Sequence, residues 1–207
     1  MAFTLESELP ANLNRETYMQ TLETRETFRP SGLAPFLRVR SISKRFGERE
    51  VLRHLDLSVQ EGEMVAIVGK SGCGKSTLLR LLAGLERPTE GTISVDCDLV
   101  NGRNRSARLM FQESALILFD EPLGALDALT RLEMQNLIEK LWQQRGFTAI
   151  LVTHDVEEAV ALADRVLLMQ HGEFRHESLV SLLRPRDRAG AEFAALKAEI
   201  LSRVLAE

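Results

Sequence analysis

Short apolar runs separated by polar turns occupy most of the chain from Phe36 onward. Runs of this length, apolar or alternating with polar residues, are typical of strands. We expect strands at 37–42, 51–59, 64–68 and 92–95, and again at 115–119, 148–152 and 165–169. Helical patterns follow at 78–83, 128–144, 156–163 and 189–205. Because strands alternate with helices, the pattern predicts an α/β fold, a mainly parallel sheet with helices on both faces, plus a small antiparallel β lobe.

The two ends of the chain differ in pattern. Residues 1–36 are rich in Glu, Thr, Asn and Pro and show no sustained period, so we expect a loose, poorly ordered extension there and one domain over 37–207. The last helix places Phe193, Leu196, Ile200 and Val204 on one stripe. Packing against the domain explains this stripe better than a partner site does.

Composition and charge exclude some classes of partner. The chain has 26 basic and 30 acidic residues among 207, a formal charge of −4, which argues against nucleic acid as a partner. No apolar run approaches the length of a membrane span and the N-terminus has no signal pattern, so we expect a cytoplasmic location. Cys73 and Cys97 show neither a disulfide framework nor zinc-ligand spacing.

Residues 69–77, Gly-Lys-Ser-Gly-Cys-Gly-Lys-Ser-Thr, fit the pattern G-x-x-x-x-G-K-[ST] between a strand and a helix. Such a loop surrounds a polyphosphate with backbone N–H groups, and the following helix directs its positive end at the same anion. In this interpretation Lys75 reaches the β- and γ-phosphates and the Ser76 hydroxyl ligates Mg²⁺. A glycine-rich turn that merely caps a helix would not explain Lys75. The predicted phosphate-binding residues are Gly69, Ser71, Gly72, Cys73, Gly74, Lys75, Ser76 and Thr77.

The apolar strand that ends in Asp120-Glu121-Pro122 supplies two adjacent carboxylates. Beside a phosphate loop, Asp120 would hold Mg²⁺ and Glu121 would take the proton from an attacking water. The alternative is a solvated acidic turn, which would need no phosphate loop nearby.

His154 lies two residues after the end of the predicted strand at 148–152, at the sheet edge where open α/β sheets bind ligands, so we expect it to contact the γ-phosphate and orient the water. A lone histidine at a strand end is otherwise more often structural. Two weaker candidates are Phe46, which could stack on adenine or simply pack, and Gln112, which could ligate Mg²⁺ or sense the nucleotide. The arginines at 184, 186 and 188 are interrupted by Pro185 and Asp187, and we interpret them as a solvated surface.

Together these motifs resemble the ATP-binding subunit of ATP-binding cassette (ABC) transporters over about residues 36–205. The resemblance identifies 69–77 as Walker A, 116–120 as Walker B, Glu121 as the catalytic glutamate, Gln112 as the Q-loop glutamine, 124–127 as the D-loop, His154 as the switch histidine and Phe46 as the adenine-stacking aromatic. Residues 111–112 and 120–135 and the Arg-Pro-Arg at 184–186 look most like aliphatic sulfonate importers, with nitrate and taurine importers similar. The resemblance implies a P-loop NTPase core that hydrolyses ATP with Mg²⁺, pairs with a second ATP-binding subunit and sits on membrane permease subunits at the cytoplasmic face of the cell membrane.

One departure from the family is large. Family members carry a helical subdomain with the signature Leu-Ser-Gly-Gly-Gln between the Q-loop and Walker B, whereas only residues 113–119 separate Gln112 from Asp120, and Ser-Gly-Gly occurs nowhere in the chain. We therefore expect an ABC-type ATP-binding domain over 37–207 with this subdomain deleted between 112 and 120. The deletion removes groups that family members supply in trans to the partner's ATP, and most of the surface that engages a permease.

The spacing raises an independent objection. In the family, the runs at 108–111 and 116–119 are both strands of the parallel core, but two parallel strands need a crossover of a dozen or more residues. We expect residues 116–120 to keep their place, which displaces Gln112 from its family position. The hypotheses are an ATP-hydrolysing importer subunit impaired by the deletion, a truncated nucleotide-binding remnant without transport activity and, less favoured because the guanine motif is absent, a small-molecule kinase or GTPase.

Overall fold

The computed structural model describes residues 34–100 and 116–206, and Pro35–Glu207 form one compact unit. The strands are β1 (Leu37–Phe46), β2 (Arg49–Val59), β3 (Met64–Val68), β4 (Glu90–Val95), β5 (Asp98–Leu99), β6 (Leu116–Asp120), β7 (Thr148–Thr153), β8 (Arg165–Gln170) and β9 (Glu173–Leu179). The helices are α2 (Lys75–Leu82), α3 (Ala128–Arg145), α4 (Val156–Leu162) and α5 (Ala191–Leu205). Every helix and strand expected from the sequence within these residues is present.

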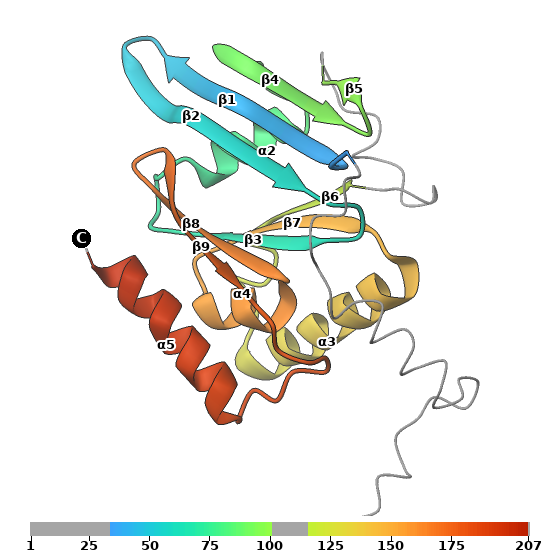
Figure 1. The fold of residues 1–207 in the computed structure, drawn as a ribbon. Helices are drawn as coiled ribbons and strands as arrows, with labels where there is room; N and C mark the ends of the chain where they lie inside the picture. Colours follow the sequence, from blue (N-terminus) through green and yellow to red (C-terminus); the bar gives the residue numbers. More distant parts are fainter. Residues whose placement is uncertain (1–33, 101–115, 207) are drawn as a thin grey trace, which may run out of the picture. The chain divides into compact units, whose positions relative to one another are not determined.

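The residues that the structure describes form two sheets (Figure 1). The antiparallel sheet has the strand order β2-β1-β4-β5, and the second sheet has the order β6-β7-β3-β8-β9. In the second sheet β6, β7, β3 and β8 are parallel, whereas β9 runs antiparallel to its neighbour β8. The predicted α/β class, with a mainly parallel sheet and a small antiparallel lobe, is confirmed.

The central strand β3 is buried on both faces, and its residues alternate between two cores. Val65 and Ile67 pack with α2 and the inner face of the antiparallel sheet. Met64, Ala66 and Val68 pack on the other side with α4, α5 and part of α3. All five β3 residues are buried, which is why this strand is a continuous apolar run rather than an alternating one. Helices therefore cover both faces of the parallel sheet, as expected.

The C-terminal helix α5 closes the second core. Phe193 and Ile200 are buried, and Leu196 and Val204 pack against the same cluster. The stripe predicted from the sequence thus packs on the domain itself. None of the helices within 34–100 and 116–206 is long and apolar enough to cross a membrane.

Two features differ from the sequence-based expectations. Phe36, which we placed in the N-terminal extension, is only 6% exposed and its carbonyl accepts a hydrogen bond from the Asp96 N–H at 2.7 Å, so the folded unit begins before Leu37. The strand β9 was not predicted. It follows a two-residue turn, His171-Gly172, in which both residues have positive φ (50° and 80°), the geometry that favours a tight hairpin.

Candidate nucleotide-binding site

Three neighbouring strands end at the same edge of the parallel sheet. β3 runs into the phosphate loop after Val68, β6 ends at Asp120, and β7 ends at Thr153 immediately before His154. The register pairs Asp120 with Val152 and Val68 with Thr153, so the three ends lie level with one another. The carboxyl edge of an open α/β sheet is where ligands bind, and the residues predicted from separate parts of the sequence meet there.

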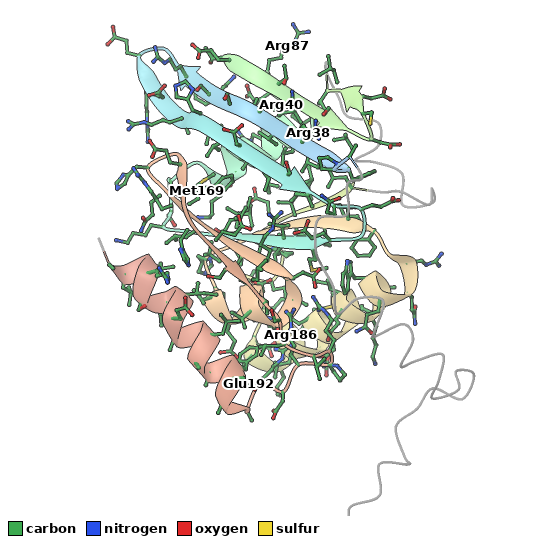
Figure 2. All side chains as sticks on the ribbon, viewed as in Figure 1. Arg38, Arg40, Arg87, Met169, Arg186 and Glu192 are labelled. Atoms are coloured by element: carbon green, nitrogen blue, oxygen red, sulfur yellow. The ribbon has the colours of Figure 1, made fainter. Side chains whose placement is uncertain are left out.

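The glycines of the phosphate loop allow two close approaches. A Cβ atom at Gly69 would lie 2.2 Å from the carbonyl oxygen of Met169, the β8 residue labelled in Figure 2. At Gly74, which has φ of 114°, a Cβ would lie 2.6 Å from the Leu52 side chain. Glycine at these two positions lets the loop sit directly against β8 and β2.

The turn between β8 and β9 also holds the loop in place. The Gly172 N–H donates to the carbonyl of Cys73 at 3.1 Å, and the Gly172 carbonyl accepts from the Arg53 N–H at 2.9 Å. Gly172 itself has no room for a side chain, because a Cβ would lie 2.3 Å from the Val51 carbonyl oxygen. Sequence reasoning missed this role, although the His-Gly pair between two apolar runs is a hairpin signal.

Lys75 lies at the start of α2, directly beneath the loop. Its side chain is buried, and Nζ donates to the carbonyls of Gly69 at 2.7 Å and Lys70 at 3.0 Å. Helix α2 begins after Gly74 with no side-chain cap and no acidic residue in its first turn. The N–H groups of that turn have no acceptor within the helix, so its N-terminus and the Lys75 ammonium together form a positive, hydrogen-bond-donating surface suited to phosphate.

The two predicted Mg²⁺ ligands next to this loop are brought together. Ser76 Oγ donates to Asp120 Oδ1 across 3.1 Å, and both side chains are exposed. Mg²⁺ prefers oxygen ligands, is held by one or two protein groups, and takes its remaining ligands from phosphate and water. A hydroxyl and a carboxylate side by side at the phosphate loop fit that requirement.

Glu121 and His154 form a second pair at the same edge. Glu121 Oε2 lies 3.2 Å from His154 Nδ1, and the two side chains are 42% and 59% exposed. Glu121 has a positive φ of 47°, an uncommon conformation for a residue with a side chain, and its N–H donates to the Val152 carbonyl at 2.8 Å. The backbone thus fixes Glu121 on β7 and points its carboxylate at the residue following that strand.

The segment after Glu121 leads into α3 through a capped turn. Asp127 Oδ1 accepts hydrogen bonds from the N–H groups of Leu129 and Thr130, the arrangement of a helix N-cap. The hydrogen bonds from Thr130 lower the pKa of Asp127. Gly124 lies close to His154, since a Cβ there would be 3.8 Å from His154 Cε1.

The other predicted residues take less central places. Ser71, Gly72 and Cys73 line a cavity of about 330 Å³ between the loop, the start of β2 and the β8–β9 turn. Thr77 is half-buried in the first turn of α2. Phe46 ends β1, opposite Arg49 of the same hairpin, and is 47% exposed, with Lys44 Nζ 4.8 Å from its ring centre. Gln112 lies outside the described residues.

The prediction of a solvated arginine surface is wrong for Arg184 and Arg186. Arg184 stacks on Trp142, 4.4 Å from the ring centre, and binds Glu139 at 3.0 Å and Asp164 at 2.9 Å. Arg186, labelled among the helices in Figure 2, donates to the carbonyl of Val160 and is 8% exposed. Burial, with the like charge of Arg184 second, lowers the pKa of Arg186 to about 9.

Arg188 also contacts the helices, because it donates a hydrogen bond to the buried Gln135 of α3. The three arginines therefore fasten the segment before α5 to α3 and α4. Their partners are far away in the sequence, so no local pattern reveals them.

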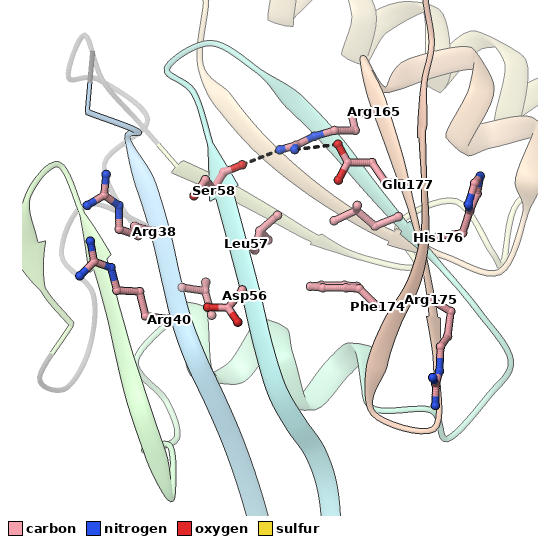
Figure 3. A pocket seen from close by; sticks show the side chains of 12 residues that line it. Arg38, Arg40, Asp56, Leu57, Ser58, Arg165, Phe174, Arg175, His176 and Glu177 are labelled. Atoms are coloured by element: carbon pink, nitrogen blue, oxygen red, sulfur yellow. Dashed lines mark hydrogen bonds and ion pairs between the residues drawn. The ribbon is translucent and has the colours of Figure 1, made fainter. Parts of the chain in front are cut away.

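A larger cavity of about 660 Å³ lies elsewhere (Figure 3). Arg38 and Arg40 of β1 lie on one side, and Phe174 and Glu177 of β9 on the other, while Arg165 donates to the Ser58 carbonyl and to Glu177. No residue that lines this cavity belongs to the candidate site.

The central strand of the parallel sheet leads into a glycine-rich loop and a helix. At the end of a second strand, a carboxylate lies beside the first hydroxyl group of that helix. This arrangement defines a P-loop nucleoside triphosphatase. Comparison with known proteins narrows the class. The family model described as ABC transporter matches residues 52–106. Aliphatic sulfonates import ATP-binding protein SsuB 3 of Pseudomonas savastanoi pv. phaseolicola is 44% identical, with 82% of this chain and 86% of the relative covered. SsuB 2 of Pseudomonas aeruginosa is 43% identical, covering 83% and 85%.

The chain belongs to the ATP-binding proteins of ABC transporters, a family of ATPases. Solved structures support the fold. The ATP-binding cassette MJ0796 in a dimeric post-hydrolysis state with ADP and Pi superposes with a TM-score of 0.59 at 20% identity, covering 70% of this chain and 98% of that one. CbiO1 from Clostridium perfringens, part of the complex cbiONQ, gives 0.59 at 16% identity, covering 72% and 90%.

The alignment with the Pseudomonas savastanoi relative is longer than the part of this chain that it covers. It runs over 232 positions, whereas 82% of 207 residues is about 170, so about 60 positions of the relative have no counterpart in this chain.

Proposed function

We propose that this chain is the ATP-binding subunit of an ABC importer for aliphatic sulfonates, that it binds MgATP, and that a deletion between residues 112 and 120 impairs its hydrolysis of ATP. The observation that best supports a nucleotide site concerns the edge of the sheet where three adjacent strands end. Five side chains lie there: Lys75, Ser76, Asp120, Glu121 and His154. The names of the relatives support the substrate class.

In this proposal the phosphate loop and Lys75 bind the β- and γ-phosphates. Lys75 already lies under the loop, held by the carbonyls of Gly69 and Lys70, so it needs little reorganisation to reach an anion in the loop. Ser76 and Asp120 would hold Mg²⁺, which neutralises charge on the phosphates when bound. Phe46 would stack on adenine.

Glu121 is the proposed general base. Its carboxylate is accessible, and its backbone is fixed by the hydrogen bond to Val152, so it can take a proton from a water directed at the γ-phosphate. His154, 3.2 Å away, would orient Glu121 and that water. Gln112 would be displaced from the Mg²⁺ site, because the deletion lies next to it.

The deletion is supported by two independent observations. Ser-Gly-Gly is absent from the sequence, and about 60 positions of the Pseudomonas savastanoi relative have no counterpart here. In a head-to-tail pair of subunits the missing signature would reach the partner's nucleotide. A charge-stabilising group supplied in trans is worth about 10³- to 10⁵-fold in turnover, so hydrolysis should be severely reduced even with the residues of this chain in place.

The test is ATP turnover by the purified chain, alone and with the relative's segment restored between Gln112 and Asp120. We expect tight ATP binding in both proteins and turnover only in the restored one. Glu121→Gln in the restored protein should keep ATP binding and lose about 10²- to 10⁴-fold in rate, the usual contribution of a positioned base. Absence of ATP binding in a folded chain would contradict the nucleotide site, and equal turnover with and without the segment would contradict the role of the deletion.

The assembly follows from the same proposal. The chain would pair with a second ATP-binding subunit and with permease subunits on the cytoplasmic face of the cell membrane, although the deletion removes most of the surface for a permease. A second candidate function is a nucleotide-binding remnant without transport, favoured by the missing signature. Sulfonate uptake restored by this chain in a strain that lacks its own ATPase would exclude the remnant.

A further inference from the structure

Helix α3 exposes an unusual number of large apolar side chains. It has 18 residues but buries only Gln135 and Trp142 fully. Leu129 and Leu132 near its start are 74% and 40% exposed. Three further residues, Met134, Leu137 and Leu141, follow the spacing i, i+3, i+7 and therefore form one line along the helix, which we call the α3 stripe; they are 36%, 46% and 43% exposed.

The contacts of α3 show which way the stripe faces. Trp142 packs in the core beneath the helix, and Glu139 binds Arg184, which also binds the carbonyl of Leu162 at the end of α4. At about 100° per residue, the centre of the stripe lies roughly opposite Glu139 around the helix. The α3 stripe therefore faces away from α4, toward the side of β6.

β6 is the end strand of the sheet within the described residues, since it pairs only with β7 there. Its Ile117 and Phe119 point into the core under α3 but are only half-buried. On β7, the residues paired nearest to them, Ala149 and Leu151, are 0% and 1% exposed. The apolar side chains of β6 on this face are therefore less completely covered than those of β7.

The handedness of the fold indicates what would complete this layer. The connection β6-α3-β7 and the connection β7-α4-β8 step across the sheet in the same direction, and both helices lie on the same face. Crossovers between parallel strands are almost always right-handed. A crossover that enters β6 from a strand beyond its edge would step in that same direction, so its helix would lie on this face beside α3, against the stripe.

We propose that the α3 stripe is the docking surface for an amphipathic helix supplied in trans, of the kind carried by the extra segment of the relatives. The inference rests on the proposed deletion. A crossover needs a dozen or more residues, and the relative has about 60 aligned positions without a counterpart here, which is enough for one with its strand. The stripe offers such a helix three apolar side chains at helical spacing, the pattern by which helix grooves bind amphipathic helices.

The experiment uses the full chain and a fluorophore-labelled polypeptide, the segment of the Pseudomonas savastanoi relative between its counterparts of Gln112 and Asp120. Fluorescence anisotropy measures its binding to the chain. We expect saturable binding that is weakened at least about tenfold by Leu137→Glu combined with Leu141→Glu, since a charge replaces buried apolar contacts. Leu201→Glu on α5 is the matched control, because Leu201 is 42% exposed and belongs to another helix; it should leave the affinity unchanged.

Circular dichroism and thermal denaturation establish that each variant is folded; if the glutamate pair does not fold, Leu137→Gln with Leu141→Gln replaces it. No saturable binding to the folded chain, or equal affinity in the stripe variant, would overturn the proposal. A stripe-dependent dimer in sedimentation that the polypeptide does not dissociate would overturn it too, because the occupant would then be a second copy. ATP binding, measured in parallel, separates this outcome from a failure of the proposed function.

Discussion

Substituting Gly69 by alanine tests whether the phosphate loop depends on its contact with β8. The added Cβ would lie 2.2 Å from the Met169 carbonyl oxygen and 3.0 Å from Cys73 Sγ. To reach an ordinary contact, the loop and β8 must separate by about 1 Å, and the obstructing atom is backbone in a strand paired on both sides. Overpacking costs typically about 1–3 kcal/mol, and because the strand cannot rotate out of the way we expect about 3 kcal/mol here.

Gly72→Ala is the matched control in the same loop. Gly72 has nothing within 4 Å of an added Cβ but has φ of 80°, so alanine there carries only the left-handed backbone cost of about 1–2 kcal/mol. The free energy of unfolding in urea and the affinity for ATP are measured for both variants. A loop that shifts to relieve the clash loses ATP affinity instead of stability. If Gly69→Ala perturbs neither quantity more than Gly72→Ala does, the steric reasoning is refuted.

Three further predictions concern binding, packing and pH. Lys75→Ala should weaken ATP binding about 10- to 100-fold in a titration with a fluorescent ATP analogue, because it removes charge-assisted hydrogen bonds; unchanged affinity would exclude the phosphate role. Arg184→Ala should lower the free energy of unfolding by about 3 kcal/mol, because it leaves the Glu139 carboxylate, which is only 12% exposed, without its partner. Arg203→Ala removes a pair that is about half exposed and should lower the free energy of unfolding by under about 1 kcal/mol. Similar losses in the two variants would contradict the argument from burial. Burial raises the pKa of Glu158 above 4.5, so the folded state keeps a proton that the unfolded chain releases, and the stability should fall as pH rises from 4.5 through the raised pKa. Glu158→Gln should flatten that slope in urea unfolding at several pH values; a slope that stays the same would assign it to another group.

The sequence predicted what is encoded locally. The glycine spacing at 69–74 defines a turn between a strand and a helix, and Asp120 and His154 could be placed at one sheet edge because each follows an apolar run in an alternating α/β pattern. The apolar stripe predicted on the last helix was also confirmed, because Phe193 and Ile200, two of its members at helical spacing, are buried against the domain.

Contacts between distant residues could not be predicted in this way. Arg184 binds Glu139, which is 45 residues away in the sequence, and Asp164, which is 20 residues away. The sequence shows only three closely spaced arginines, which resemble a solvated run, although Arg184 and Arg186 are buried or nearly so. Gly172 likewise acts on Cys73, and only the folded structure brings them together.

The Gly172 turn has a consequence for the order of events during synthesis. The loop at 69–74 leaves the ribosome about a hundred residues before the turn that hydrogen-bonds to it, and β8, against which Gly69 packs, is made equally late. Contacts this far apart in sequence form only after both partners are available. A nascent chain that ends before Gly172 therefore carries the complete glycine motif without the hydrogen bond to Cys73, and we expect the loop to be held in place only after the C-terminal hairpin has emerged.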